Sequence, residues 1–442
     1  AVTDKADLND VAKIQALINT VNTTEANNAA SAAAVNKVSE AAGNSSAASQ
    51  VSIADLNAIT GLDNEILANL TAYQAAIVEV VNKVDLNDVA KIQTLIDSVN
   101  TTEANNAAST AAITKVSEAA TNGNEANVSI ADLNAIIGLT NQDAANLAAY
   151  QTAIAAVTDK ADLNDVAKIQ ALIEQVNLLV AIGTEADDAS TTASFTEAQF
   201  ASLPVTSVTT LNVVAYNTYI DANANLFSAP ATVAEVQSMV TSVNTTKANN
   251  AASTAAIDEV SAATTNGNQA DVSIADLNAI IGLDNEILAN LADYQTAIAA
   301  VTDKDNLNDV AKIQALINTV NTTKANNAAS TAAITKVSEA TGNGNEADVS
   351  IADLNAIIDL TGQDVTNLAA YQTAIAAVTD KDNLNDVAKI QALINTVNTT
   401  EADNAASTAA IDEVSAATTN GNQANVSIAD LNAIIGLTNE IS

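Results

Sequence analysis

Acidic residues gather in a turn that returns along the chain, and clustered carboxylates of this kind could bind calcium. Calcium in proteins takes about six to eight oxygen ligands, which carboxylates and amides supply. The second version of the turn, residues 82–88, has one carboxylate fewer, and one position changes freely between Asp and Asn, as a helix cap does. We therefore interpret the turns first as helix caps on a solvated surface and keep calcium as the alternative. The candidate ligands are Asp4, Asp7, Asp10, Asp159, Asp162, Asp165, Asp303, Asp305, Asp309, Asp380, Asp382 and Asp386.

Composition limits other kinds of chemistry. The 442 residues include 52 acidic and 15 basic side chains, all of the latter lysines, for a formal net charge of -37. Because histidine and cysteine are absent, there is no Ser-His-Asp triad, no cysteine nucleophile and no ordinary zinc site. The pair Asp187-Asp188 lies in a polar stretch with nothing nearby to adapt it to acid–base work. We expect no enzyme and no cofactor.

The same composition bears on partners. The acidic excess repels phosphate, which argues against nucleic-acid binding, and it disfavours an anionic membrane surface. The longest notable apolar run, residues 178–182, is far shorter than the roughly 20 residues that span a bilayer. The expected partner is another copy of the chain, since repeated units offer many equivalent surfaces.

A helix must position the acidic turns, and the stretch DLNDVAKIQALINTVN, residues 7–22, predicts one. Its apolar residues recur at three- and four-residue steps, which lines one face. In the degraded copy, residues 229–244, Pro230 is expected at the first helical position. The expected face consists of Leu8, Val11, Ile14, Leu17, Ile18 and Val21, and the expected caps are Asp7, Asp85, Asp162, Asn306 and Asn383.

This stretch marks six tandem copies of one unit, and regular spacing indicates a repeat architecture. The equivalents of Leu8 are Leu86, Leu163, Pro230, Leu307 and Leu384, at spacings of 78, 77, 67, 77 and 77 residues. The predicted repeats are 1–78, 79–155, 156–222 (divergent and shortened), 223–299, 300–376 and 377–442 (incomplete). Because both ends fall within a unit, we expect the chain to be a segment of a longer array.

Each full repeat is predicted to hold four helical segments. The second follows a Thr-Thr pair, and a Gly/Asn linker leads to VSIADLNAI, where Ser52 and Asp55 form a capping-box pattern. The fourth segment carries Tyr73 or an equivalent tyrosine. The predicted fold is all-α, a tandem array of small helical bundles of about 77 residues, elongated or solenoid-like. Sequons at the Thr-Thr pairs are interpreted as helix-to-helix turns rather than glycosylation sites; they begin at Asn22, Asn100, Asn244, Asn321 and Asn398.

Residues 178–232 break the pattern, and this copy is shorter, with the loss expected in its second helix. All three phenylalanines and two additional tyrosines lie here. Large rings could fill the volume left by a lost helix, or they could form a partner-binding surface. The partner-binding candidates are Phe195, Phe200, Tyr216, Tyr219 and Phe227.

In its acidic, arginine-free, Asn/Thr/Ala-rich repeats, the whole chain resembles the repeat regions of very large secreted bacterial surface proteins: adhesin stalks, surface layers and extracellular filaments. The resemblance implies a non-enzymatic structural role outside the cell or at its surface, as the protomer of a fibre, sheath or surface layer. The alternative is an adhesin stalk or spacer, or a binding module with its specificity in residues 178–232, with calcium as a possible stiffening ion.

Overall fold

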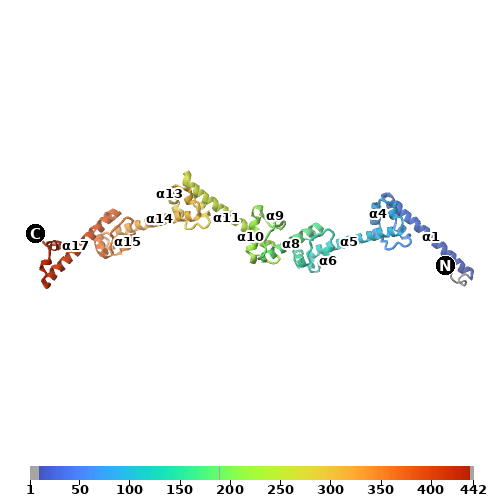
Figure 1. The fold of residues 1–442 in the computed structure, drawn as a ribbon, viewed down its shortest axis with the longest axis horizontal. Coiled ribbons are helices and arrows are strands. Elements are labelled where there is room, and N and C mark those ends of the chain that lie inside the picture. The colour runs from blue at the N-terminus through green and yellow to red at the C-terminus, as the bar shows by residue number, and fades with distance from the viewer. Residues whose placement is uncertain (1–8, 189, 439–442) are drawn as a thin grey trace. The chain divides into compact units, whose positions relative to one another are not determined.

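The computed structural model describes residues 9–188 and 190–438 as an all-helical protein with no strand among them. The predicted all-α repeat is confirmed (Figure 1). The long helices are α1 (Val11–Ala41), α5 (Val89–Asn122), α8 (Val166–Asp187), α11 (Val233–Asn266), α14 (Val310–Glu339) and α17 (Val387–Asn420). The tyrosine helices are α4 (Leu70–Glu79), α7 (Leu147–Ala156), α10 (Val213–Ala222), α13 (Leu291–Ala299) and α16 (Leu368–Ala376). Short capped helices lie between them: α2 (Ser45–Ala48), α3 (Ile53–Asn57), α6 (Ile130–Ala135), α9 (Glu197–Ser202), α12 (Ile274–Ala279), α15 (Ile351–Ala356) and α18 (Ile428–Ala433).

By its packing the chain divides into two units, Ala1–Asn244 and Thr245–Ser442. The described part of the first unit contains three hydrophobic cores and that of the second contains two; we call the surrounding groups of helices bundles 1 to 5. Bundles and sequence repeats share one period but differ in phase, because each bundle begins in one long helix and ends in the next. The buried apolar residues run from Ala34 to Ile96, Ala112 to Val176, Leu178 to Val243, Ala256 to Val320 and Ala333 to Val397.

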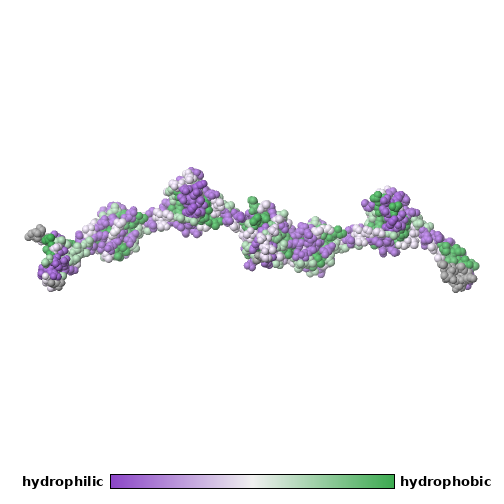
Figure 2. All heavy atoms as spheres, viewed as in Figure 1, coloured by the Kyte–Doolittle hydropathy of each residue, from purple (hydrophilic) through white to green (hydrophobic). Residues whose placement is uncertain are grey.

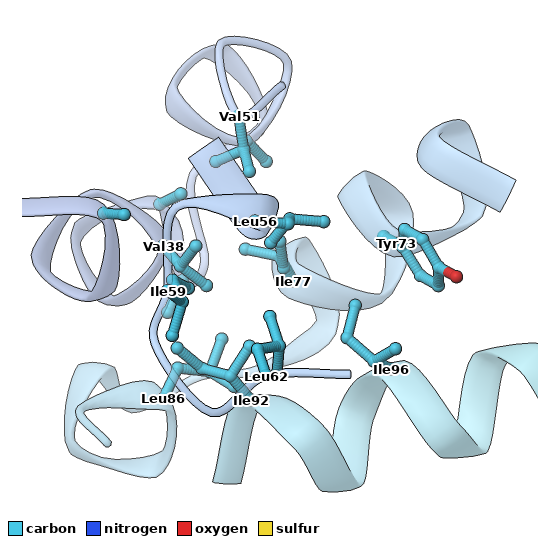
Figure 3. Packing of buried hydrophobic residues seen from close by; sticks show 14 residues of the cluster. Val38, Val51, Leu56, Ile59, Leu62, Tyr73, Ile77, Leu86, Ile92 and Ile96 are labelled. Atoms are coloured by element: carbon cyan, nitrogen blue, oxygen red, sulfur yellow. The ribbon is translucent and has the colours of Figure 1, made fainter. Parts of the chain in front are cut away.

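Bundle 1 shows how the cores are built. Figure 3 shows Val38 from the end of α1, Leu56 from α3, Ile77 from α4 and Ile96 from α5 pointing toward one another. These four side chains are almost fully buried, and burying an aliphatic side chain contributes about 1.5–3 kcal/mol. One long helix therefore closes one core with its first half and opens the next core with its second half, as α5 does for bundles 1 and 2.

The apolar face predicted for the first half of the long helix is confirmed where a bundle covers it. Ile92 and Ile96 are 1% and 0% exposed, whereas Ile14 and Ile18 at the equivalent positions of α1 are 41% and 46% exposed. In Figure 2 this first stretch of α1 is green, that is, hydrophobic, beside the grey residues. Leu8, the first residue of the predicted face, lies outside the described residues.

The predicted turn at the Thr-Thr pairs is wrong, because the helix runs straight through them. In α5 the hydroxyls of Thr101 and Thr102 donate to the carbonyls of Asp97 and Ser98, at 2.8 and 3.0 Å. Threonine is a weak helix former, but it neither lacks an N–H nor frees the backbone as proline and glycine do. With no such breaker in the segment, the two predicted helices merge into one of 34 residues.

The predicted helix starts are also displaced, by three residues. Asp88, not Asp85, caps α5, and its carboxylate accepts from the N–H of Lys91 at 3.0 Å. Asp85 instead lies in a 3-10 turn, Lys83–Leu86, that buries Leu86. The same arrangement recurs, with caps Asp10, Asp165, Asp309 and Asp386. The sequence shows an Asp or Asn at both places, so pattern alone does not separate the two.

The degraded copy needs a separate correction. Helix α11 begins at Val233, so Pro230 precedes the helix instead of occupying its first position. A Thr-Glu capping pair starts the helix: Glu235 N–H donates to Thr232 at 3.2 Å, and Thr232 N–H donates to Glu235 at 2.7 Å. The capping box expected at VSIADL is confirmed in all its copies, beginning with Ser52 and Asp55 in α3.

Candidate functional site

A polar cluster ties the tyrosine helix of bundle 1 to the middle of α5. Tyr73 is fully buried, and its hydroxyl donates to Asn100 Oδ1 at 2.5 Å while accepting from the N–H of Ile66 at 3.0 Å. Asn69 Nδ2 also donates to Asn100 Oδ1, at 2.8 Å, and Asn100 Nδ2 donates to the carbonyl of Asn64 at 2.8 Å. Figure 3 shows the Tyr73 hydroxyl directed away from the aliphatic core. Each polar atom of the asparagine is therefore satisfied, and we call this arrangement the Tyr–Asn cluster.

The Tyr–Asn cluster recurs in every described bundle, with the tyrosine hydroxyl 2.5–2.7 Å from the asparagine oxygen. The backbone carbonyl that accepts from the asparagine Nδ2 belongs in each cluster to a left-handed residue, such as Asn64 with φ 67°. The role of the asparagine was not predicted, although its separation from the tyrosine in sequence, 27 residues in four pairs and 28 in bundle 3, carries the signal. The pairs are Tyr73–Asn100, Tyr150–Asn177, Tyr216–Asn244, Tyr294–Asn321 and Tyr371–Asn398.

Four of these asparagines are also the sequon asparagines, which changes the interpretation of the sequons. A glycan attached to Asn100 Nδ2 would replace one of its two hydrogens, beside the one that donates to the carbonyl of Asn64, at a half-buried position. It would also project from inside a continuous helix at a point already packed against the tyrosine helix. The geometry therefore disfavours glycosylation of the folded chain, for a different reason from the turn that the sequence suggested.

Beyond the Tyr–Asn cluster, α5 crosses to bundle 2 as an exposed helix. Residues 101–108 are exposed except for the half-buried Glu103, and burial resumes at Ser109, whose hydroxyl accepts from the N–H of Ile137 at 2.9 Å. We call such a stretch a spacer; equivalents in the second unit are residues 322–329 and 399–406. A helix with polar residues on all sides gains little stability from packing, so the packed segments at its two ends must stabilise it.

Helix α8 joins bundles 2 and 3 differently. It has 22 residues instead of 34, and the buried residues pass without a gap from Val176 in one core to Leu178 in the next. Gln175 Nε2 donates to the carbonyl of Ser202 at 3.1 Å, which links the two bundles directly. We call this the fused junction, in contrast to the spacer junction of α5. An open groove of about 520 Å³ lies beside it, lined by Asn141, Glu174, Asn177, Leu178, Ala181, Ala198, Gln199 and Ser202.

The aromatic residues of the divergent copy lie in or against the core of bundle 3. Phe200 and Tyr216 are fully buried with ring centres 5.6 Å apart, and Phe227 is 7% exposed. Phe195 and Tyr219 are half-buried and meet Phe200 and Phe227 edge to face. The rings thus fill volume in the core, as the first of the two interpretations expected. The large apolar side chains that this bundle exposes are Leu211, at 94%, Val214, at 78%, and Leu226, at 52%.

Gly183 lets bundle 3 close around the shortened helix. A Cβ built on this residue of α8 would lie 2.4 Å from the carbonyl oxygen of Ser228 and 2.9 Å from the nitrogen of Ala231. The same close approach allows the N–H of Ala231 to donate to the carbonyl of Leu179 at 3.0 Å. Only glycine leaves room for the backbone of residues 228–231 here.

Most of the acidic calcium candidates that the structure describes act as caps. Asp159 accepts from the N–H of Ala161 at 2.8 Å, and Asp165 accepts from that of Lys168 at 3.0 Å. The described residues hold no group of three or more carboxylates placed to bind a metal ion. Asp162, Asp305 and Asp382 lie in 3-10 turns, Asp303 and Asp380 cap them, and Asp4 and Asp7 lie outside the described residues.

These caps are charged groups held in their ionised form. Hydrogen bonds from the backbone and side chain of Lys312 and its charge keep the pKa of Asp309 below its ordinary value of 3.8. At the short helices, burial is the largest single influence and raises the pKa of Asp55, but hydrogen bonds from Lys37 and Ser52 together lower it below 3.8. Lys37 Nζ lies 2.6 Å from Asp55 Oδ2. Acid will therefore weaken these caps.

Two remaining features carry no chemistry of their own. Asp188 accepts from the N–H and hydroxyl of Ser190, which lowers its pKa, so this carboxylate stabilises a turn.

Helix α8 is long and apolar enough, by length and composition, to cross a membrane, with a mean hydropathy of 1.4, although the sequence indicated no such segment. In the structure its apolar residues Ile169, Ile173 and Ile182 lie in the cores of bundles 2 and 3.

Comparison of the chain with protein-family models, with curated proteins and with solved structures finds no match.

Proposed function

We propose that this chain is a non-enzymatic structural repeat protein of the bacterial cell surface or exterior, the protomer of a fibre, sheath or surface layer. The observation that supports it is the repetition of one bundle with one Tyr–Asn cluster in every described copy. Repetition multiplies equivalent surfaces, whereas catalysis needs a single adapted site. The acidic, cysteine-free surface agrees with a life outside the cell.

Helices that continue from one core into the next suit this role. In α5 a single 34-residue helix, about 51 Å long, belongs to both bundle 1 and bundle 2. Distance along the chain is then set by the helix itself and not by a flexible linker.

Electron microscopy of the purified 442-residue chain over a range of protein and salt concentrations tests the proposal. Ordered fibres or sheets are expected, and salt promotes them because it screens the net charge of -37. Particles that stay single under all conditions contradict self-assembly and favour the stalk or spacer alternative. Ala107→Pro, which breaks the α5 spacer, is expected to reduce order in the assemblies while the bundles stay folded; Ala107→Gly is its milder control.

A binding module remains the second candidate, and the exposure of Leu211 and Val214 favours it. Leu211, at 94%, and Val214, at 78%, lie three positions apart in the divergent bundle and give a partner an apolar surface to cover. The double change Leu211→Ser and Val214→Ser should abolish partner capture without unfolding bundle 3. If assemblies form equally well with this variant, the patch has no part in self-association.

A further inference from the structure

Asn-Gly pairs mark the loop that follows a long helix, and they carry chemistry of their own. The pairs are Asn122-Gly123, Asn266-Gly267, Asn343-Gly344 and Asn420-Gly421. Asparagine is among the chemically labile residues of proteins, and a following glycine leaves the peptide nitrogen unhindered. Bundles 1 and 3 lack the pair, so one chain contains both reactive and unreactive versions of the same loop.

We infer that Asn122 and Asn266 are sites of spontaneous conversion to aspartate and isoaspartate, and that Asn343 reacts more slowly. The nitrogen of Gly123 bonds to Cγ of Asn122, the Cγ–Nδ2 bond breaks, and ammonia leaves with the proton of the peptide N–H. Water then opens the five-membered imide at either carbonyl. Opening at one gives aspartate, and opening at the other gives isoaspartate, with the side-chain carbon in the main chain.

The surroundings of Asn122 and Asn266 leave this reaction unhindered. Each is the last residue of its helix, α5 or α11, where fraying frees the backbone to reach the ring-forming geometry. Both side chains are exposed, and among the described residues neither amide makes a hydrogen bond. The following Gly123 has φ +65° and open space around its α-carbon, so nothing blocks the approach.

Two other asparagines in the equivalent loops are restrained. Asn343 Nδ2 donates to the carbonyl of Glu339 at 2.8 Å, a bond that has to break before ammonia leaves. In bundle 1 the order is reversed to Gly43-Asn44, and Asn44 Oδ1 accepts from the N–H groups of Ser46 and Ala47 as the cap of α2. Asn44 is thus held by two hydrogen bonds and is followed by serine instead of glycine.

The product has a structural consequence. A carboxylate at residue 122 lies at the C-terminus of α5, where the helix dipole disfavours negative charge. Isoaspartate lengthens the main chain just before Val128, which is fully buried in the core of bundle 2. The modification therefore loosens the end of a shared helix, and it accumulates with the age of the molecule.

Ageing of the folded chain in mildly alkaline buffer, followed by cleavage after lysine and mass spectrometry with separation of isoaspartyl peptides, tests the inference. Cleavage places each asparagine on its own peptide: 38–83, 116–160, 248–304 and 337–381 carry Asn44, Asn122, Asn266 and Asn343. Isoaspartate should appear first in 116–160 and 248–304, later in 337–381, and last or not at all in 38–83. Equal rates for Asn122 and Asn44 in the folded chain overturn the inference.

Two controls separate structure from sequence. In denaturant the difference between Asn343 and Asn122 should vanish, because the bond to Glu339 is lost; a difference that persists shows that this bond plays no part. Gly123→Ala should remove most of the isoaspartate at Asn122. Asn266 in the same molecule should form isoaspartate at an unchanged rate and serves as the internal reference. If Asn122 in that variant reacts as fast as before, the proposed ring closure is wrong.

Discussion

The spacer junction of α5 and the fused junction of α8 connect neighbouring bundles in two different ways. Both helices lend their first half to one core and their second half to the next. In α5 the two halves are separated by the exposed residues 101–108, whereas in α8 the cores adjoin and Gln175 donates to the carbonyl of Ser202. We infer that the length of the shared helix decides whether neighbouring bundles unfold separately or together.

The largest effect is expected from two substitutions that destabilise the bundles on either side of bundle 2. Leu56→Ala removes a fully buried side chain from bundle 1 at a cost of about 3 kcal/mol. Gly183→Ala forces a backbone shift in bundle 3 at a cost of about 2 kcal/mol. Hydrogen exchange followed by mass spectrometry should show that only Gly183→Ala also lowers protection in bundle 2.

Thr184→Ala, at the exposed neighbour of Gly183, serves as the matched control and should leave protection in both bundles unchanged. Equal loss of protection in bundle 2 from Leu56→Ala and Gly183→Ala would show that a spacer transmits destabilisation as well as a fused junction does.

The Tyr–Asn clusters offer the next test. Asn100→Ala and Asn177→Ala each leave a buried tyrosine O–H without its acceptor and a backbone carbonyl without its donor, at a cost of about 2 kcal/mol to the bundle concerned. Glutamyl endopeptidase should then cleave the Asn100→Ala variant faster at Glu103, because the spacer loses its anchored end. In the Asn177→Ala variant, Glu174 should stay resistant although it is exposed, since both cores hold the helix. Rapid cleavage at Glu174 would contradict the rigidity of the fused junction.

Acid should destabilise the capped helices of the bundles to different extents. The capping-box carboxylates of Asp55, Asp132 and Asp353 have pKa values below the ordinary 3.8. The stability they contribute is therefore complete above that value and is lost as the pH falls through the lower pKa of the folded state. Bundle 3 uses Gln199, which does not titrate, in the equivalent capping box. Below about pH 4, hydrogen exchange should therefore rise at α3, α6 and α15 before α9. Ser52→Ala, which removes the other half of the box, should reduce this difference for α3.

The smallest effect concerns a single buried oxygen. Gln142 Nε2 donates to the carbonyl of Leu133 at 3.4 Å, whereas Glu65 at the equivalent position of bundle 1 has a buried Oε1 without a hydrogen-bond partner. Glu65→Gln supplies the missing donor and should stabilise bundle 1 by about 1 kcal/mol in calorimetric unfolding. Gln142→Glu should destabilise bundle 2 by a similar amount; no change in either variant would mean that the oxygen is already satisfied by solvent.

Local pattern predicted the elements of this fold well, because the signals are local. Apolar residues at helical spacing predicted the burial of Ile92 and Ile96, and Ser52 with Asp55 predicted a capping box. Where two local signals competed, as at Asp85 and Asp88, the sequence suggested the wrong one.

The remaining features depend on contacts between segments distant in sequence. The helix continues past Thr101 because both of its ends are packed in a core. The helix propensities of the residues do not include this tertiary packing. Asn100 gained its role only when the tyrosine helix folded against it. The close backbone approach at Gly183 could not be predicted from the sequence. A glycine inside a helix indicates close packing only once the position of the neighbouring backbone is known.

Bundle boundaries inside continuous helices have a consequence for how such a gene changes. Recombination between equivalent codons of two regular repeats would add or remove one whole period of about 77 residues wherever the breakpoint falls, whereas the divergent copy has a spacing of 67. The rejoined chain keeps every helix in phase and every core closed, so no intermediate with half a core has to be tolerated. The array can thus lengthen or shorten by unequal crossover as freely as its DNA allows.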